Sequence, residues 1–136
     1  MPKKKIRILV VDDEIGDLNL MCNVLRSQDY TVFAAASYAE AIQAHRMHEG
    51  AINLLVADVS LPDKNGCELA LTLLESDPAV KVLFVSGATG TEIFKFTKLL
   101  MSEVQLLVKP FAPRELLNRV RRILEPAVPV RTLGAS

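Results

Sequence analysis

Residues that could carry chemistry follow short apolar runs at four places in the sequence. Asp12 and Asp13 follow the first run, Asp58 the third, Ser86 the fourth and Lys109 the fifth. Carboxylates bind hard divalent cations, whereas a hydroxyl and an ammonium group can hold a phosphoryl oxygen. Three converging carboxylates repel one another, so their grouping requires positive charge, which a metal ion and Lys109 could supply.

The residue types predict which metal this site would bind. Asp12, Asp13 and Asp58 offer only oxygen ligands, with no His or Cys nearby in the sequence. Such a set indicates Mg²⁺, with Mn²⁺ as an alternative. Because Mg²⁺ prefers one or two carboxylates, several waters and a phosphate oxygen, we expect the site to be complete only when phosphate arrives.

Five apolar runs alternate with longer helix-like segments and must position these residues. Several runs are nearly continuous in Val, Leu and Ile, which is typical of parallel strands covered on both faces. The alternation predicts an α/β fold with a doubly wound parallel sheet and helices on both faces. Ligands of such sheets bind at the carboxyl ends of the strands. The predicted strands are 6–11, 31–35, 52–57, 80–85 and 104–108.

Length and composition set the domain organisation. The chain has 136 residues, half of them apolar, which fits one domain at 1–125 with a flexible tail or truncated linker at 126–136. Ser37 and Glu40 form a capping-box pattern and Pro113 suits a first helical turn, so a helix is predicted after each signal.

Charge and residue usage exclude several classes of protein. Lys plus Arg and Asp plus Glu both total 16, so no global field attracts nucleic acid or an acidic membrane. No apolar stretch is long enough for membrane insertion, and we expect a cytoplasmic protein. Cys22 and Cys67 are expected to be buried and reduced, and His45 and His48 are interpreted as surface residues.

Five short motifs surround the residues that could carry chemistry. They are Val10-Val11-Asp12-Asp13-Glu14, Val56-Ala57-Asp58, Leu61-Pro62-Asp63-Lys64-Asn65-Gly66, Val85-Ser86-Gly87 and Val108-Lys109-Pro110-Phe111. Together they resemble the receiver domain of two-component response regulators, as in chemotaxis regulators. The resemblance covers Ile6 to about Leu124 and implies a five-stranded sheet with the flavodoxin-like order 2-1-3-4-5.

The resemblance also implies a role for each site residue. Asp58 is the phospho-acceptor, which takes a phosphoryl group from a phosphohistidine and forms an aspartyl phosphate. Asp12, Asp13, Asp58 and the main-chain carbonyl of Ser60 bind Mg²⁺. Lys109 and Ser86 hold the phosphoryl group, and the Lys109–Pro110 bond is cis.

One position departs from the family's pattern. Family members often carry Tyr or Phe three residues before the lysine as a switch, but this chain has Leu106. The usual readout of phosphorylation is therefore in doubt. Extra apolar residues in the segment 91–101 suggest an interface that involves Phe94 and Met101, although core packing is the commoner use of such residues.

These observations favour a phospho-accepting regulatory domain that catalyses only its own phosphorylation and dephosphorylation. The implied partners are a sensor histidine kinase or phosphotransfer protein, and a downstream protein or fused output domain. A homodimer is possible, whereas direct nucleic acid contact is not expected, because no helix-turn-helix segment follows the arginine-rich last helix.

Two alternatives use the same residues. The first is a receiver-like interaction module that works without phosphorylation. The second is a Mg²⁺-dependent phosphohydrolase, which is disfavoured because such enzymes resemble an Asp-x-Asp signature after the first strand. A dinucleotide site is excluded at the first strand, where carboxylates stand in place of the glycines that pyrophosphate requires.

Overall fold

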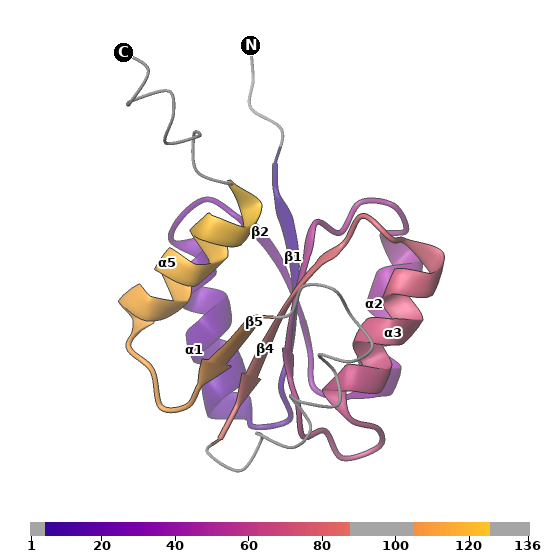
Figure 1. Ribbon diagram of the computed structural model, residues 1–136, viewed down its shortest axis with the longest axis horizontal. Coiled ribbons are helices and arrows are strands. Elements are labelled where there is room, and N and C mark those ends of the chain that lie inside the picture. The colour runs from indigo at the N-terminus through magenta and orange to yellow at the C-terminus, as the bar shows by residue number, and fades with distance from the viewer. Residues whose placement is uncertain (1–4, 88–104, 126–136) are drawn as a thin grey trace.

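The computed structural model describes residues 5–87 and 105–125. Strands and helices alternate along most of this part of the chain (Figure 1). The predicted strands lie within two residues of the observed ones at either end. The elements, with the labels of Figure 1, are β1 (Arg7–Val11), α1 (Ile15–Arg26), β2 (Thr31–Ala35), α2 (Tyr38–Met47), β3 (Leu54–Asp58), α3 (Gly66–Ser76), β4 (Lys81–Ser86), β5 (Gln105–Val108) and α5 (Pro113–Leu124).

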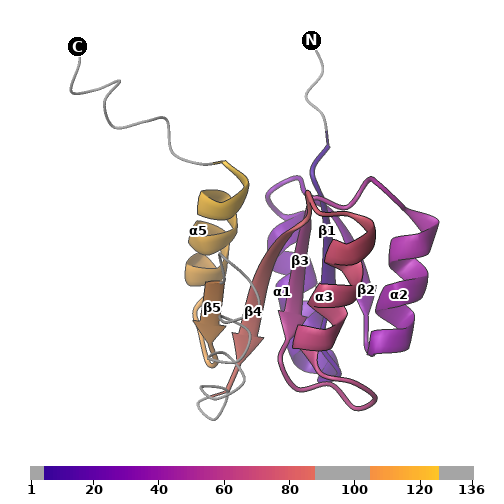
Figure 2. The same ribbon diagram turned by 45° about the vertical axis from the view of Figure 1, so that its right-hand side comes forward.

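The strands form one parallel sheet in the order β2-β1-β3-β4-β5. This confirms the predicted doubly wound fold and its strand order. Helices α1 and α5 cover one face and α2 and α3 the other, as Figure 1 shows. Figure 2 shows β2 and β5 at opposite edges of the sheet, so that β1, β3 and β4 lie inside it.

The apolar runs predict this three-layer arrangement, because strands that are apolar on both faces must be covered on both faces. Successive side chains of a strand point to opposite faces. In β1, Ile8 and Val10 pack on the α1/α5 side, whereas Leu9 and Val11 pack on the α2/α3 side. All four side chains are fully buried. The first polar side chains after these apolar runs therefore lie at or just beyond the ends of the strands, at one edge of the sheet.

The predicted helix signals are observed with one change in detail. Ser37 caps α2 by accepting a hydrogen bond from the Glu40 amide at 3.1 Å, while Glu40 Oε1 accepts from the Ala36 amide at 2.9 Å instead of the Ser37 amide. Pro113 occupies the first turn of α5. Both helices therefore begin where the sequence predicts.

The burial of the two cysteines agrees with the prediction, whereas the burial of His45 does not. Cys22 and Cys67 are buried and unbonded, as predicted. The interpretation of His45 as a surface residue is wrong, because it is only 5% exposed. His45 lies four residues after the buried Ala41, and this spacing places both on the inner face of α2. His48 is partly exposed and stacks on Phe33, with 3.9 Å between ring centroids.

Some predictions fall on residues that the structure does not describe. The suggested interface at Phe94 and Met101 and the predicted tail at 126–136 both lie outside the described residues. Within the described ranges, none of the helices is long and apolar enough to cross a membrane. The cytoplasmic location stays a prediction.

Candidate functional site

The ends of four strands bring the predicted site residues to one edge of the sheet. Asp12 directly follows β1, and Lys109 directly follows β5. Asp58 and Ser86 are the last residues of β3 and β4, one residue later than the predicted strand ends. Asp58 and Ser86 are therefore part of the sheet and are held by its backbone hydrogen bonds.

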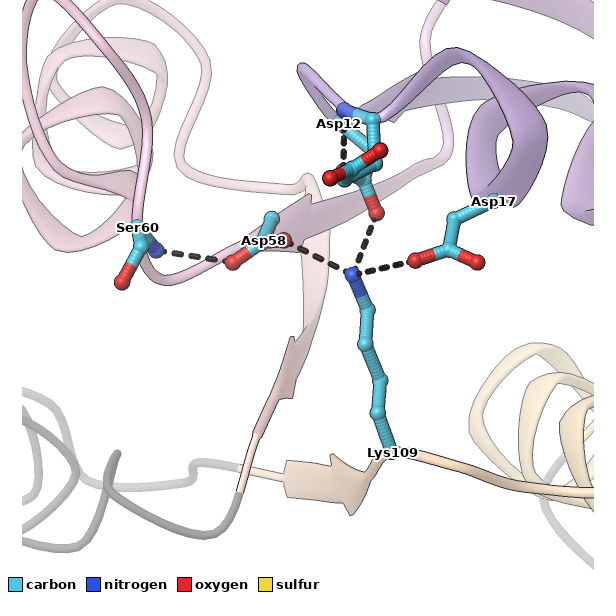
Figure 3. A network of polar contacts seen from close by, with 6 residues as sticks. Asp12, Asp17, Asp58, Ser60 and Lys109 are labelled. Atoms are coloured by element: carbon cyan, nitrogen blue, oxygen red, sulfur yellow. Dashed lines mark hydrogen bonds and ion pairs between the residues drawn. The ribbon is translucent and has the colours of Figure 1, made fainter.

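Lys109 connects the carboxylates of two strands. Its Nζ donates to Asp12 Oδ2 at 2.7 Å and to Asp58 Oδ2 at 2.8 Å (Figure 3). It also donates to Asp17 Oδ2 at 3.1 Å. Only 19% of the Lys109 side chain is exposed, so these ion pairs are shielded from solvent more than typical surface pairs. The Lys109–Pro110 bond is cis, as the resemblance implies.

Backbone amides hold the other oxygen of each buried carboxylate. The Glu14 amide donates to Asp12 Oδ1 at 2.9 Å, and the Ser60 amide donates to Asp58 Oδ1 at 2.8 Å. Asp12 is fully buried and Asp58 is 8% exposed. Each carboxylate is therefore fixed by one amide and one ammonium group, which suits a site that must act without rearranging.

Burial and charge shift two pKa values in the site. Burial raises the pKa of Asp12 above its usual value, against hydrogen bonds from Lys109 and the Glu14 amide that lower it. Burial alone would lower the pKa of Lys109, but hydrogen bonds to Asp12, Asp58 and Asp17 outweigh it and raise this pKa. Lys109 is therefore a permanent cation at neutral pH, in a site with more negative than positive charge.

Three carboxylates form a cluster of the kind that a hard cation requires. One oxygen each from Asp12, Asp13 and Asp58 lie within 4.8 Å of one another. Asp13 is exposed, while the other two are buried, so the cluster has a solvent side by which an ion can enter. The donor set contains only carboxylate oxygens, which fits Mg²⁺ and Mn²⁺ better than softer metals.

Gly66 shapes the loop behind Asp58. A Cβ atom at this position would overlap the main-chain oxygen of Asp58 and lie 3.0 Å from its carbonyl carbon and 3.2 Å from Val59 Cα. The Gly66 amide donates to the Val59 carbonyl at 2.8 Å. The close approach of the two main-chain segments therefore leaves no room for a side chain at Gly66.

Three further residues singled out by the sequence lie in or beside the strands that form the site. Ser86 is 4% exposed, and its main-chain carbonyl accepts from the Lys109 amide at 2.7 Å. Ser60 is exposed and follows Asp58 by two residues. Leu106 is half-buried on β5, opposite Phe84 of β4. The hydroxyl of Ser86 and the carbonyl of Ser60 remain predicted ligands.

Asp17 also contacts the site, although the sequence does not single it out. It lies in the first turn of α1. Its contact with Lys109 depends on residues 92 positions apart in the sequence. The local sequence offers no signal for this contact, because it marks Asp17 only as an acidic residue in the first turn of α1.

Comparison with known proteins identifies the family. Residues 8–121 match the model of the response regulator receiver domain. The aerobic respiration control protein ArcA of Escherichia coli K12 is 35% identical over 127 residues, which are 93% of this chain and 52% of ArcA. The chain thus spans about half the length of this curated relative.

Solved structures agree with the family match. A CheY-like receiver domain protein from Methanospirillum hungatei JF-1 has a TM-score of 0.80 and 29% identity, with 90% of this chain and 95% of that chain covered. A structure described as the BeF3-activated DrrB receiver domain has a TM-score of 0.77 and 28% identity, with 90% and 99% covered. The sheet order, the placement of the acidic residues and these matches lead to one conclusion: the chain belongs to the response regulator receiver domain family.

Proposed function

We propose that Asp58 accepts a phosphoryl group from a phosphohistidine of a partner protein, with Mg²⁺ bound beside it. Receiver domains are regulatory, and this one would act by changing a protein-interaction surface when Asp58 is phosphorylated. The observation that carries the proposal is the position of the Lys109 ammonium group, 2.7 Å from Asp12 and 2.8 Å from Asp58, beside the cluster formed with Asp13.

The transfer needs an oriented carboxylate and little else from the protein. An Asp58 oxygen attacks the phosphorus atom, the new O–P bond forms, and the P–N bond to the imidazole breaks with its electron pair going to the nitrogen. The Ser60 amide and Lys109 hold the Asp58 carboxylate in one orientation before the donor arrives. This arrangement lowers the entropy cost of reaching the attack geometry.

Three carboxylates would hold the metal ion. Asp12, Asp13 and Asp58 supply the clustered oxygens, and the predicted carbonyl of Ser60 would be a further ligand. The ion supplies positive charge for the oxygens of the phosphoryl group during transfer. Lys109 supplies a second positive charge. It reaches the site from the end of β5, whereas the acids lie at the ends of β1 and β3.

The partners follow from the proposed chemistry. The phosphoryl donor would be a sensor histidine kinase or a phosphotransfer protein, and the receiver of the signal would be a downstream protein or a fused output domain. ArcA is a control protein about twice as long as the matched segment, so chains longer than the receiver domain occur in the family. Leu106 is half-buried against the α2/α3 side core. A readout through repacking at this leucine is expected to be smaller than one through an aromatic side chain.

Intact-mass spectrometry after incubation with acetyl phosphate and Mg²⁺ tests the proposal. The wild-type chain should gain one labile phosphoryl adduct, and Asp58→Asn should gain none because its amide cannot attack phosphorus. Asp29→Asn is a matched control, since its side chain is 91% exposed and pairs only weakly with Lys5 at 3.4 Å. This control should be labelled like the wild type.

The other outcomes favour different functions. A folded wild-type chain without an adduct would contradict the proposal and favour an interaction module that works without phosphorylation. Multiple turnover of a small phosphate ester, retained in Asp58→Asn, would favour a phosphohydrolase.

A further inference from the structure

Asp17 contacts the site without belonging to the metal cluster. Its Oδ2 accepts a hydrogen bond from Lys109 Nζ at 3.1 Å, and Figure 3 shows it approaching from α1 on the side away from Asp58. The clustered oxygens come from Asp12, Asp13 and Asp58. Asp17 therefore acts on the site only through Lys109.

The three carboxylate partners of Lys109 differ in what they can do during phosphorylation. An ammonium group has three N–H donors, and Asp12, Asp17 and Asp58 accept one each. Asp12 and Asp58 also face the metal cluster, and Asp58 is the proposed acceptor. Asp17 is the one of these three partners that lies outside the metal cluster, so it competes with an arriving phosphoryl oxygen for the Lys109 ammonium group.

The charge of Asp17 also changes what the site prefers to bind. Asp12, Asp13, Asp17 and Asp58 bring four carboxylates to one ammonium group, so the described site has an excess of negative charge. A further carboxylate favours a divalent cation and opposes an anionic phosphoryl group. The Asp17 side chain is 48% exposed, so solvent reduces this effect but does not remove it.

We infer that Asp17 is a positioning residue that competes with the phosphoryl group for Lys109 and so biases the site toward Mg²⁺ and against phosphoryl anions. The inference rests on the proposed function, because it describes the balance between metal and phosphoryl group at the same site. Asp17 does not touch the reacting atoms. Its effect is exerted on Lys109, whose ammonium charge it partly neutralises.

The experiment measures two binding constants in Asp17→Asn, which keeps the shape of the side chain and removes its charge. Mg²⁺ binding is followed by NMR titration of backbone amides, and beryllofluoride binding at saturating Mg²⁺ by fluorine NMR. The variant should bind Mg²⁺ roughly twofold to fivefold more weakly and beryllofluoride more tightly by a similar factor. Asp17→Glu, which restores the carboxylate, should move both constants back toward the wild-type values.

Opposite shifts of the two constants separate positioning from a structural effect. A loosened α1 would weaken both ligands, and that result, or two unchanged constants, would overturn the inference. Asp29→Asn removes a carboxylate beyond the other end of α1 and should leave both constants unchanged. If the wild-type chain binds Mg²⁺ but no beryllofluoride, the proposed function fails as well. If it binds both and Asp17→Asn changes neither, only the role of Asp17 fails.

Discussion

At the scale of single residues, Lys109 is the group on which the charge balance of the acidic site depends. It is the ion-pair partner of the fully buried Asp12 and the nearly buried Asp58. Removing one partner of a buried ion pair leaves the other charge without compensation, which costs more than the pair itself contributes. Lys109 therefore compensates part of the negative charge of the buried carboxylates.

Replacing Lys109 by Met should lower the free energy of unfolding by about 3 kcal/mol in the absence of metal. The carboxylates of Asp12 and Asp58 would then repel each other with no cation between them. Urea unfolding at neutral pH in EDTA measures the change. Lys81→Met is the control, because Lys81 is exposed at the start of β4 and should change stability by no more than about 0.5 kcal/mol. Equal stability of the two variants would contradict this account of Lys109.

Asp13 is expected to contribute to metal binding and little to folding. It is exposed, whereas its two cluster neighbours are buried. In Asp13→Asn, Mg²⁺ should lose most of its stabilising effect. A ligand that binds only the folded state raises stability in proportion to the logarithm of one plus the ratio of its free concentration to its Kd, and the substitution raises that Kd. Thermal unfolding with and without Mg²⁺ measures this. A midpoint that rises as much as in the wild type would exclude Asp13 as a ligand.

Sequence predicts the site residues that mark strand ends but not those that depend on tertiary contact. Asp12, Asp58, Ser86 and Lys109 could be found because each follows an apolar run. The ion pair of Asp17 with Lys109 could not, since local pattern shows only an acidic first turn.

At the scale of elements, the loop after β3 is tied to the start of α2. Asp63 accepts hydrogen bonds from the Tyr38 and Ala39 amides at 3.0 and 3.1 Å. The Tyr38 hydroxyl lies 2.9 Å from Thr72 Oγ1 of α3, and Lys64 Nζ lies 4.9 Å from the Tyr38 ring centroid. The loop that carries the predicted Ser60 ligand is thus fixed against two helices.

The hydrogen bonds to Asp63 should make the stability of the folded chain depend on pH in the acid range. The hydrogen bond from the Tyr38 amide, with those from Ala39 and Lys64, holds the pKa of Asp63 below its usual 3.8. A lowered pKa in the folded state stabilises the protein above pH 3.8, and this stabilisation is lost as the pH falls through the folded-state value. Asp63→Asn should be less stable than the wild type at pH 7, and the gap should close in strong acid. Urea midpoints across this range measure the gap, and a constant gap would contradict the explanation.

The junction of β3 and α3 depends on the absence of a side chain at Gly66. Gly66→Ala should lower the free energy of unfolding by about 1–3 kcal/mol, because its Cβ would meet the main chain at Asp58 and Val59. Gly16→Ala is the matched control, since nothing lies within 4 Å of a Cβ there and alanine favours the helix α1. Urea unfolding of both variants should give changes of opposite sign, and equal changes would argue against a specific clash.

At the scale of the whole molecule, the fold was predictable because both faces of every inner strand are apolar. The alternation of such strands with helices left little choice except a doubly wound parallel sheet, and the observed order is the predicted one. Strand ends were less certain, because Asp58 and Ser86 are polar residues that still pair within the sheet. His45 was misplaced for a similar reason, as a polar residue on a buried helix face.

The proposed role of Asp58 is tested most directly by locating the phosphoryl group in the chain. Borohydride reduction of the acetyl phosphate-treated chain, followed by peptide mapping with tandem mass spectrometry, converts an aspartyl phosphate into homoserine at its position. If Asp58 carries the phosphoryl group, homoserine should be found at position 58 in the wild-type chain and in Asp29→Asn. Homoserine at position 12 or 13, or an unmodified position 58 in a chain that carries phosphate, would contradict this role of Asp58.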